Sequence, residues 1–189
     1  MQGKSRYHQT QTQLASENDA VEAAKKDPKK FEVLYNKYYE QIFRYVHQRM
    51  EDKDTAFDVT SQVFLKAMTN LKKYQFKGVP FSSWLYRIAM SEVYQSFKDQ
   101  QSTRTVNIET SHVSDMIEEF EEVDNSELRE ILLQLISELP EVELQIIEMR
   151  YFEKRSYREI GEILDLTENN AKVKAYRIVG KLKKAFNKR

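Results

Sequence analysis

The sequence contains no cysteine, which excludes disulfide bonds and thiolate metal sites. It has only four glycines and three prolines among 189 residues. Glycine and proline disfavour helices most strongly, so their scarcity, together with abundant Leu, Ile, Lys and Glu, predicts an all-α protein. The lack of cysteine also fits a reducing compartment, and we expect the protein to be cytoplasmic.

The sequence also lacks an apolar run long enough to cross a membrane, and its polar first residues lack the apolar core of a signal peptide. We therefore expect no direct membrane insertion. The three histidines, His8, His47 and His112, are scattered along the chain. Neither metal-ligand spacing, nor a phosphate-binding loop, nor a nucleophile–base pattern is present, so we expect no enzyme, no catalytic residue, no metal and no cofactor.

The 30 basic and 30 acidic residues cancel, but they are unevenly distributed. Residues 59–91 hold five basic residues and no acidic one, and residues 171–189 hold eight basic residues and no acidic one. Between them, residues 105–130 hold nine acidic residues and one basic residue. This pattern predicts two basic surfaces separated by an acidic connector.

The hydrophobic pattern divides the chain into four parts. Residues 1–18 are polar and are expected to form a disordered tail, with the first helix beginning near Pro28. Apolar residues recur at helical spacing over 19–101 and again over 126–189. The acidic segment 102–125 is expected to be a flexible linker or a marginal helix. The sequence therefore predicts two small helical domains joined by an acidic linker.

In the first predicted domain, one helix is expected over the segment "DKDTAFDVTSQVFLKAMTNL". Its buried stripe is expected to comprise Ala56, Val59, Val63, Ala67 and Leu71. A loop, "YQFKGVP", follows, and then a second helix, "FSSWLYRIAMSEVYQSFKDQ", which Ser82 or Ser83 could cap.

The stretch "YREIGEILDLTENNAKVKAYR" predicts two helices joined by a tight corner. Gly161 lets a second helix approach closely, Asp165 tolerates a left-handed backbone, and Thr167 is a good N-cap. The second helix would bury Ala171, Ala175, Ile178 and Leu182. Its other side would expose amides, cations and an aromatic ring, which suits the recognition helix of a helix-turn-helix. A helical hairpin with a solvated basic face fits the same pattern.

Four segments carry further motifs. In chain order they are "FEVLYNKYYEQIFRYVHQRM", "DKDTAFDVTSQVFLKAM", "FSSWLYRIA" and "LPEVELQIIEMRYFEKRSYREIGEIL". In this order they resemble the extracytoplasmic-function (ECF) group of bacterial sigma factors, which retain only conserved regions two and four. The first resembles the start of region two, the second the core-polymerase-binding helix, the third the promoter-melting segment and the fourth the start of region four. The resemblance covers residues 28–186.

The chain departs from the family pattern at several positions. Ser61 stands where the family often has Gln, and Asn170, Ala171 and Lys172 stand where it often has Thr-Val-Lys. In the promoter-melting segment, the departures from the usual Asn, Asp and Arg fall at Ser91, Gln95 and Lys98.

The resemblance implies a sigma factor that binds core RNA polymerase and directs promoter-specific initiation. It would recognise the upstream (minus-thirty-five) and downstream (minus-ten) promoter elements and assist DNA melting. The implied partners are core RNA polymerase, promoter DNA and an anti-sigma factor.

The resemblance also implies three sets of site residues. The set for the upstream element is Tyr157, Arg158, Asn169, Asn170, Lys172, Val173, Tyr176 and Arg177. The set for the downstream element and melting is Phe76, Lys77, Ser82, Ser83, Trp84, Ser91, Tyr94, Gln95 and Lys98. The set for core polymerase is Asp58, Gln62 and Phe64, with Phe64 as an exposed aromatic on a polar side. For Trp84 and Tyr176, packing within the protein is an equally open interpretation.

A self-sufficient repressor or activator with a C-terminal helix-turn-helix is an alternative. It predicts dimerisation and tight promoter binding without polymerase. The segment "FSSWLYRIA" argues against this alternative.

Overall fold

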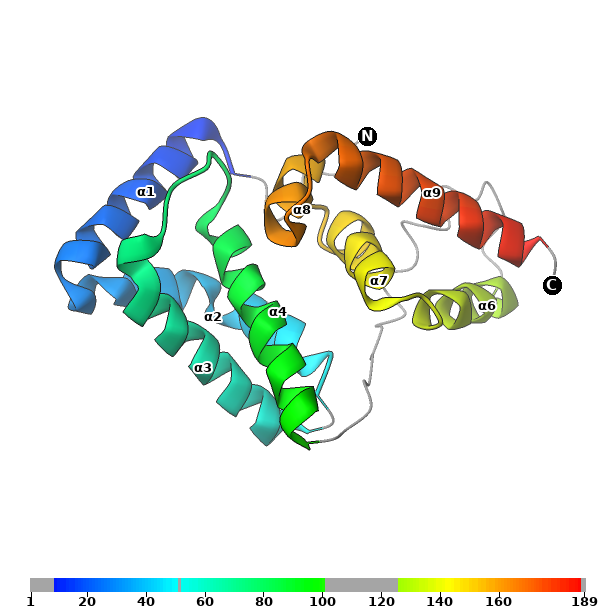
Figure 1. Ribbon diagram of the computed structural model, residues 1–189, viewed down its shortest axis with the longest axis horizontal. Coiled ribbons are helices and arrows are strands. Elements are labelled where there is room, and N and C mark those ends of the chain that lie inside the picture. Colours follow the sequence, from blue (N-terminus) through cyan, green and yellow to red (C-terminus); the bar gives the residue numbers. More distant parts are fainter. Residues whose placement is uncertain (1–8, 51, 101–125, 188–189) are drawn as a thin grey trace. The chain divides into compact units, whose positions relative to one another are not determined.

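The computed structural model describes residues 9–50, 52–100 and 126–187, and within these ranges the regular secondary structure is entirely helical (Figure 1). The described residues form two compact units, residues 9–100 and residues 126–187, called here the N-terminal and C-terminal units. The prediction of an all-α protein with two small helical domains is therefore confirmed. The predicted linker, residues 102–125, lies outside the described residues. None of the described helices is both long and apolar enough to cross a membrane.

The N-terminal unit contains four α-helices and two short 3-10 turns. They are α1 (Gln11–Lys26), η1 (Pro28–Lys30), α2 (Phe31–His47), α3 (Lys53–Asn70), η2 (Leu71–Lys73) and α4 (Phe81–Gln100).

Helix α3 is central to this unit because it packs against both α2 and α4. The stripe predicted from the sequence faces this core, and all five of its members are buried: Ala56, Val59, Val63, Ala67 and Leu71. Asp52 caps the helix, since its carboxylate accepts hydrogen bonds from the backbone nitrogen and the hydroxyl of Thr55, both at 2.7 Å. These hydrogen bonds lower the pKa of the Asp52 carboxyl below its ordinary value, because they stabilise the charged form.

The first helix begins earlier than the sequence predicts. The expected disordered tail, residues 1–18, is wrong for residues 11–18, which belong to α1. Thr10 and Gln13 form a capping box at the start of this helix, and Leu14, Val21 and Ala24 bury its inner side. Residues 1–8 lie outside the described residues. Pro28 starts a short 3-10 turn rather than the first helix.

The C-terminal unit is built around a long terminal helix that packs against the three helices before it (Figure 1). Its elements are α6 (Ser126–Ser137), α7 (Glu141–Ile147), a π-helical turn (Glu148–Phe152), α8 (Tyr157–Leu164) and α9 (Glu168–Phe186). Pro140 separates α6 from α7, as expected.

The start of α8 is fixed by a buried ion pair network. Arg155 is fully buried, and its Nε donates a hydrogen bond to Glu153 Oε2 at 2.7 Å. Its Nη1 lies 3.5 Å from Glu159 Oε1. Glu159 also forms a capping box with Ser156, accepting from the Ser156 backbone nitrogen at 3.0 Å. Glu159 therefore contacts both the buried guanidinium of Arg155 and the N-cap residue of α8, Ser156.

Candidate nucleic-acid interface

The corner between α8 and α9 has the geometry that its sequence predicts. Asp165 adopts a left-handed conformation, with φ 57° and ψ 45°. The Leu166 backbone nitrogen donates to the Gly161 carbonyl oxygen at 2.8 Å, which closes the turn. Thr167 then caps α9 by accepting from the Asn170 backbone nitrogen at 3.1 Å. Because each of these contacts is local, the direction of α9 follows from the residues of the corner itself.

Helix α9 buries one side and exposes the other. Ala171, Ala175, Ile178 and Leu182 are buried, as predicted. The polar residues of the predicted upstream-element set lie on the exposed side, together with Val173 and Tyr176, which is 59% exposed. Amides and cations on one helix face can donate to phosphates and base edges. The exposed members of the set on α9 are Asn169, Asn170, Lys172, Val173, Tyr176 and Arg177.

The start of α8 adds to this face. Arg158 is exposed, and Tyr157 is half-buried with its ring centroid 6.4 Å from that of Tyr176. Tyr176 therefore has both a packing partner and an exposed surface. The guanidinium of Arg150 lies over the Tyr157 ring at 4.6 Å, and its Nη1 donates to the Arg155 carbonyl oxygen at 3.0 Å. Arg150 was not predicted from the sequence, because only the folded chain brings it to Tyr157.

A groove between α7 and α9 extends the basic surface. It has a volume of about 250 Å³ and an apolar floor that includes Ile146 and Ile178. Lys174, Arg177 and Lys181 supply its cations. Lys181 forms a 2.9 Å ion pair with Glu143. Lys174 and Lys181 were missed among the site residues, although their spacing from Arg177, three before and four after, places them on the same side of the helix.

The loop of the N-terminal unit presents its central residues to solvent. Phe76 is 41% exposed, Lys77 is exposed, and Gly78 has φ 72°, a conformation that glycine adopts without strain. Val79 and Pro80 are buried and return the chain to α4. An aromatic ring beside a cation is a suitable surface for an unstacked base and its phosphate.

Two predicted members of this downstream-element set are not accessible. Ser82 and Ser83 are 2% and 0% exposed, so neither can contact DNA in this structure. Nor does either cap the helix, because α4 begins at Phe81 and both serines already lie in its first turn. The Phe81 backbone nitrogen donates instead to the carboxylate of Glu17, at 2.6 Å. The sequence did not reveal this cap, since the two residues are 64 positions apart.

Trp84 is half-buried, and it packs against Tyr74 and Phe81 with ring centroids 5.2 and 5.5 Å apart. This contact supports the packing interpretation of Trp84 and leaves part of its ring exposed. Further along α4, the other members of the set lie on the exposed side, where Tyr94 is 73% exposed. They are Ser91, Tyr94, Gln95 and Lys98.

The predicted polymerase-binding face needs one correction. Asp58 and Gln62 are exposed, but Phe64 is only 3% exposed. The rings of Tyr35 and Tyr39 on α2 cover it, with centroids 4.8 and 6.0 Å from that of Phe64. Burial and the neighbouring Tyr35 raise the pKa of the Tyr39 hydroxyl above its ordinary value.

The exposed apolar residues of α3 are Phe57, Leu65 and Met68, which are 38%, 49% and 40% exposed. Their spacing of eight and then three residues places them close to one side of the helix. That spacing was a signal in the sequence. It was missed because Phe64, which is buried, was assigned to the exposed side in their place.

Comparisons with known proteins agree with these two units. The family model "Sigma-70 region 2" matches residues 34–103, and the model "Sigma-70, region 4" matches residues 129–182. Among curated proteins, the chain is 22% identical over 157 residues to the ECF RNA polymerase sigma factor SigM of Bacillus subtilis, covering 82% of this chain and 94% of SigM. It is 26% identical over 164 residues to the ECF sigma-E factor of Escherichia coli, covering 81% and 84%.

A third relative is the ECF sigma factor BldN of Streptomyces coelicolor, 27% identical over 150 residues. That match covers 77% of this chain and 56% of BldN, so the chain spans little more than half of this relative. Among solved structures, CnrH in complex with the cytosolic domain of CnrY is similar in fold. The TM-score is 0.56 at 17% identity, over 89% of this chain and 94% of that one.

Proposed function

This chain belongs to the ECF group of RNA polymerase sigma factors, and we propose that it carries its promoter-reading surfaces on two separate units. As a sigma factor, it directs promoter-specific transcription initiation by RNA polymerase. The proposal concerns which residues perform each part of that function. The observation that carries it is the exposed polar and aromatic face of α9, which follows a hydrogen-bonded corner after α8.

The C-terminal unit reads the upstream promoter element. Helix α9 enters the major groove, and Lys172 near its start reaches a base edge. Arg177 lies five residues further along, about 7.5 Å down the axis, and contacts a phosphate. Val173 and Tyr176, which lie between Lys172 and Arg177 on the helix, make apolar contacts with the DNA. Arg158 reaches the DNA backbone from α8.

The N-terminal unit acts on the downstream element. Phe76 stacks on an unpaired base, and Lys77 neutralises the adjacent phosphate. Tyr94 and Lys98 lie on the exposed side of α4 and contact the same strand. Opening the duplex is favoured because these groups bind the single strand and not the paired one.

The core enzyme binds the exposed face of α3. Phe57, Leu65 and Met68 supply the apolar centre of this contact, and Asp58 and Gln62 supply its polar edge. Apolar residues surrounded by polar ones are typical of a protein interface.

An anti-sigma factor is the remaining proposed partner. The similar structure of CnrH is a complex with the cytosolic domain of CnrY, which is a precedent for a second protein bound to this fold. Such a protein would inhibit by covering the apolar residues of α3 that core polymerase needs.

Transcription in vitro tests the proposed function. The purified chain is combined with core RNA polymerase on a library of genomic fragments, and the 5′ ends of the transcripts are mapped. We expect start sites that require the chain. The DNA before these start sites should share two sequence elements, one for each unit. Start sites identical to those of core polymerase alone would refute the proposal.

A further inference from the structure

Both ends of the loop at residues 74–80 are hydrogen-bonded to the same helix, α1. The ammonium of Lys25 donates to the Tyr74 carbonyl oxygen at 2.9 Å. At the other end, the Phe81 backbone nitrogen donates to Glu17 Oε2 at 2.6 Å. Glu17 and Lys25 are eight residues apart, which corresponds to about 12 Å along the helix. Figure 1 shows the loop running beside α1.

Glu17 provides what the start of α4 lacks. The residue before the helix is Pro80, which has no side-chain acceptor, and the first turn of α4 contains no acidic residue. The first backbone N–H groups of a helix need an acceptor, and a negative charge is favourable at that end. The Glu17 carboxylate satisfies both needs from a different helix.

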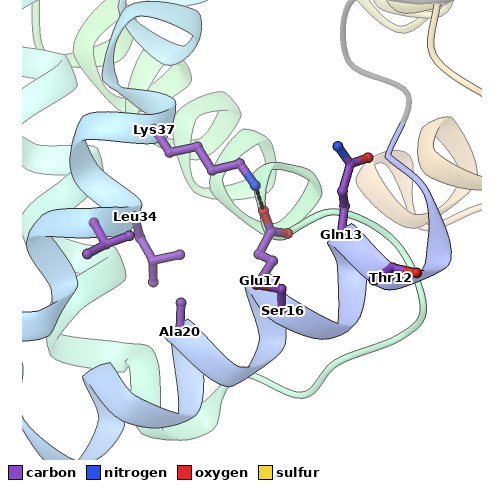
Figure 2. A pocket seen from close by; sticks show the side chains of 8 residues that line it. Thr12, Gln13, Ser16, Glu17, Ala20, Leu34 and Lys37 are labelled. Carbon is purple, nitrogen blue, oxygen red and sulfur yellow. Dashed lines mark hydrogen bonds and ion pairs between the residues drawn. The ribbon is translucent and has the colours of Figure 1, made fainter.

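The position of Glu17 is itself fixed by α2. Its side chain is 3% exposed, and its Oε1 accepts from the Lys37 ammonium at 2.6 Å (Figure 2). The same oxygen accepts from the Tyr38 hydroxyl and from Gln9 Nε2, the latter at 3.2 Å. A buried carboxylate is costly unless it is paired and hydrogen-bonded, so these contacts hold it in one orientation.

The two ends of the loop also meet each other. The rings of Tyr74 and Phe81 have centroids 5.1 Å apart, and both contact Trp84. Lys25 is held toward Tyr74 by a 2.7 Å ion pair with Glu22. The exposed Phe76 and the neighbouring Lys77 therefore lie between two fixed points.

We propose that Glu17 and Lys25 are positioning residues for promoter opening. By fixing both ends of the loop, they reduce the conformations that Phe76 and Lys77 sample before they meet an unpaired base, which lowers the entropic cost of binding it. Helix α1 thus takes part in melting, although it lies outside residues 34–103, which match region 2. This inference rests on the proposed function of the loop.

The test uses the full chain with Glu17→Gln and Lys25→Met. The control variants are Asp19→Asn and Lys26→Met, which remove the same groups from exposed positions on the same helix. Trp84 is the only tryptophan in the chain and touches both ends of the loop, so its fluorescence reports on them without any DNA. We expect both test variants to increase quenching of Trp84 by acrylamide, with helix content unchanged, while the controls do not.

The second readout is opening of a promoter duplex by the chain with core polymerase. We expect both test variants to slow opening about three- to tenfold, which is within the range of the net contribution of one ordinary hydrogen bond. On a template already unpaired over the downstream element, the rate should recover most of this loss. A defect confined to overall stability would lower activity on both templates alike.

Unchanged Trp84 quenching in both test variants would overturn the inference, because the loop ends would then not depend on α1. Increased quenching with equal activity loss on both templates would also overturn it, since the loop would then not act in opening. If Glu17→Gln fails to fold, Lys25→Met decides, because it leaves no unpaired charge in the core. Failure of the proposed function would give a different result: the unaltered protein would then not support initiation by core polymerase.

Discussion

The carbonyl oxygen of Leu166 lies 2.7 Å from the position that a methyl group on Gly161 would occupy. The backbones of α8 and of the corner therefore meet directly, with no room for a side chain. The other glycine of this unit, Gly180, has nothing within 4 Å of the same position. These two glycines form a matched pair on two helices of one helix-turn-helix.

We expect Gly161→Ala to destabilise the protein by about 1–3 kcal/mol, because the added methyl group must displace backbone. Gly180→Ala is expected to stabilise α9 by about 0.5–1 kcal/mol, since alanine has the higher helix propensity. Denaturant unfolding of both variants measures the difference. Equal effects of the two substitutions on the free energy of unfolding would show that the close approach at the corner does not contribute to stability.

The division of roles on α9 is a second prediction. Arg177→Ala should weaken binding of the polymerase complex to all promoter sequences and reduce the salt slope by about one, as expected for one lost phosphate contact. Lys172→Ala should cost about 1–3 kcal/mol at one base position and relax the preference there. Binding is measured across salt and a panel of upstream-element variants.

Lys184→Ala is the control for these two variants, because Lys184 is an exposed cation in the last turn of the same helix. It should leave the base preference unchanged. If neither Lys172→Ala nor Arg177→Ala changes affinity, preference or salt slope, α9 does not enter the groove.

The exposed loop residues give a third prediction. Changing Phe76 and Lys77 together to Ala should slow promoter opening on duplex DNA by about tenfold or more, because base stacking alone contributes about 1–3 kcal/mol. A template already unpaired at the downstream element should restore much of the activity. Gln75→Ala, at an exposed neighbouring position, should change neither rate. An equal loss on both templates would assign Phe76 and Lys77 to folding or docking.

The exposed face of α3 gives a fourth prediction. Leu65→Lys and Met68→Lys should each weaken binding to core polymerase by about 1–2 kcal/mol, while stability changes by about 0.5 kcal/mol or less. Competition with the unaltered chain for core enzyme measures the affinity. Val33→Lys is the control, because Val33 is 61% exposed and lies on α2, not on α3. Unaltered affinity in both α3 variants would place the polymerase contact elsewhere.

The sequence predicted best where structure is local. Asp165, Thr167 and the buried side of α9 follow from turn chemistry, capping and helical spacing within about fifteen residues. The exposed character of Tyr94 and Arg177 follows from the same spacing. The predicted site residues that prove to be exposed are mainly those whose neighbours are close in the sequence.

The predictions that failed depended on distant contacts. Helix α1 has a polar sequence, and the burial of its Glu17 depends on contacts with Lys37, Tyr38 and Phe81, which are far along the chain. Phe64 is buried because α3 packs against two helices, so its buried side is wider than one stripe. Ser83 lies buried in the first turn of α4, and the first backbone nitrogen of this helix donates to Glu17, 64 positions earlier. Propensity and periodicity do not encode these long-range contacts.

The most direct test of the account is binding of one mapped promoter duplex by the chain alone, by core polymerase alone and by both together. Anisotropy of a labelled duplex measures binding, and transcript yield from the same duplex measures initiation. We predict weak binding by the free chain, and tight, specific binding with initiation only when both are present. Tight, specific binding by the free chain with no effect on initiation would contradict the account and identify a self-sufficient repressor or activator.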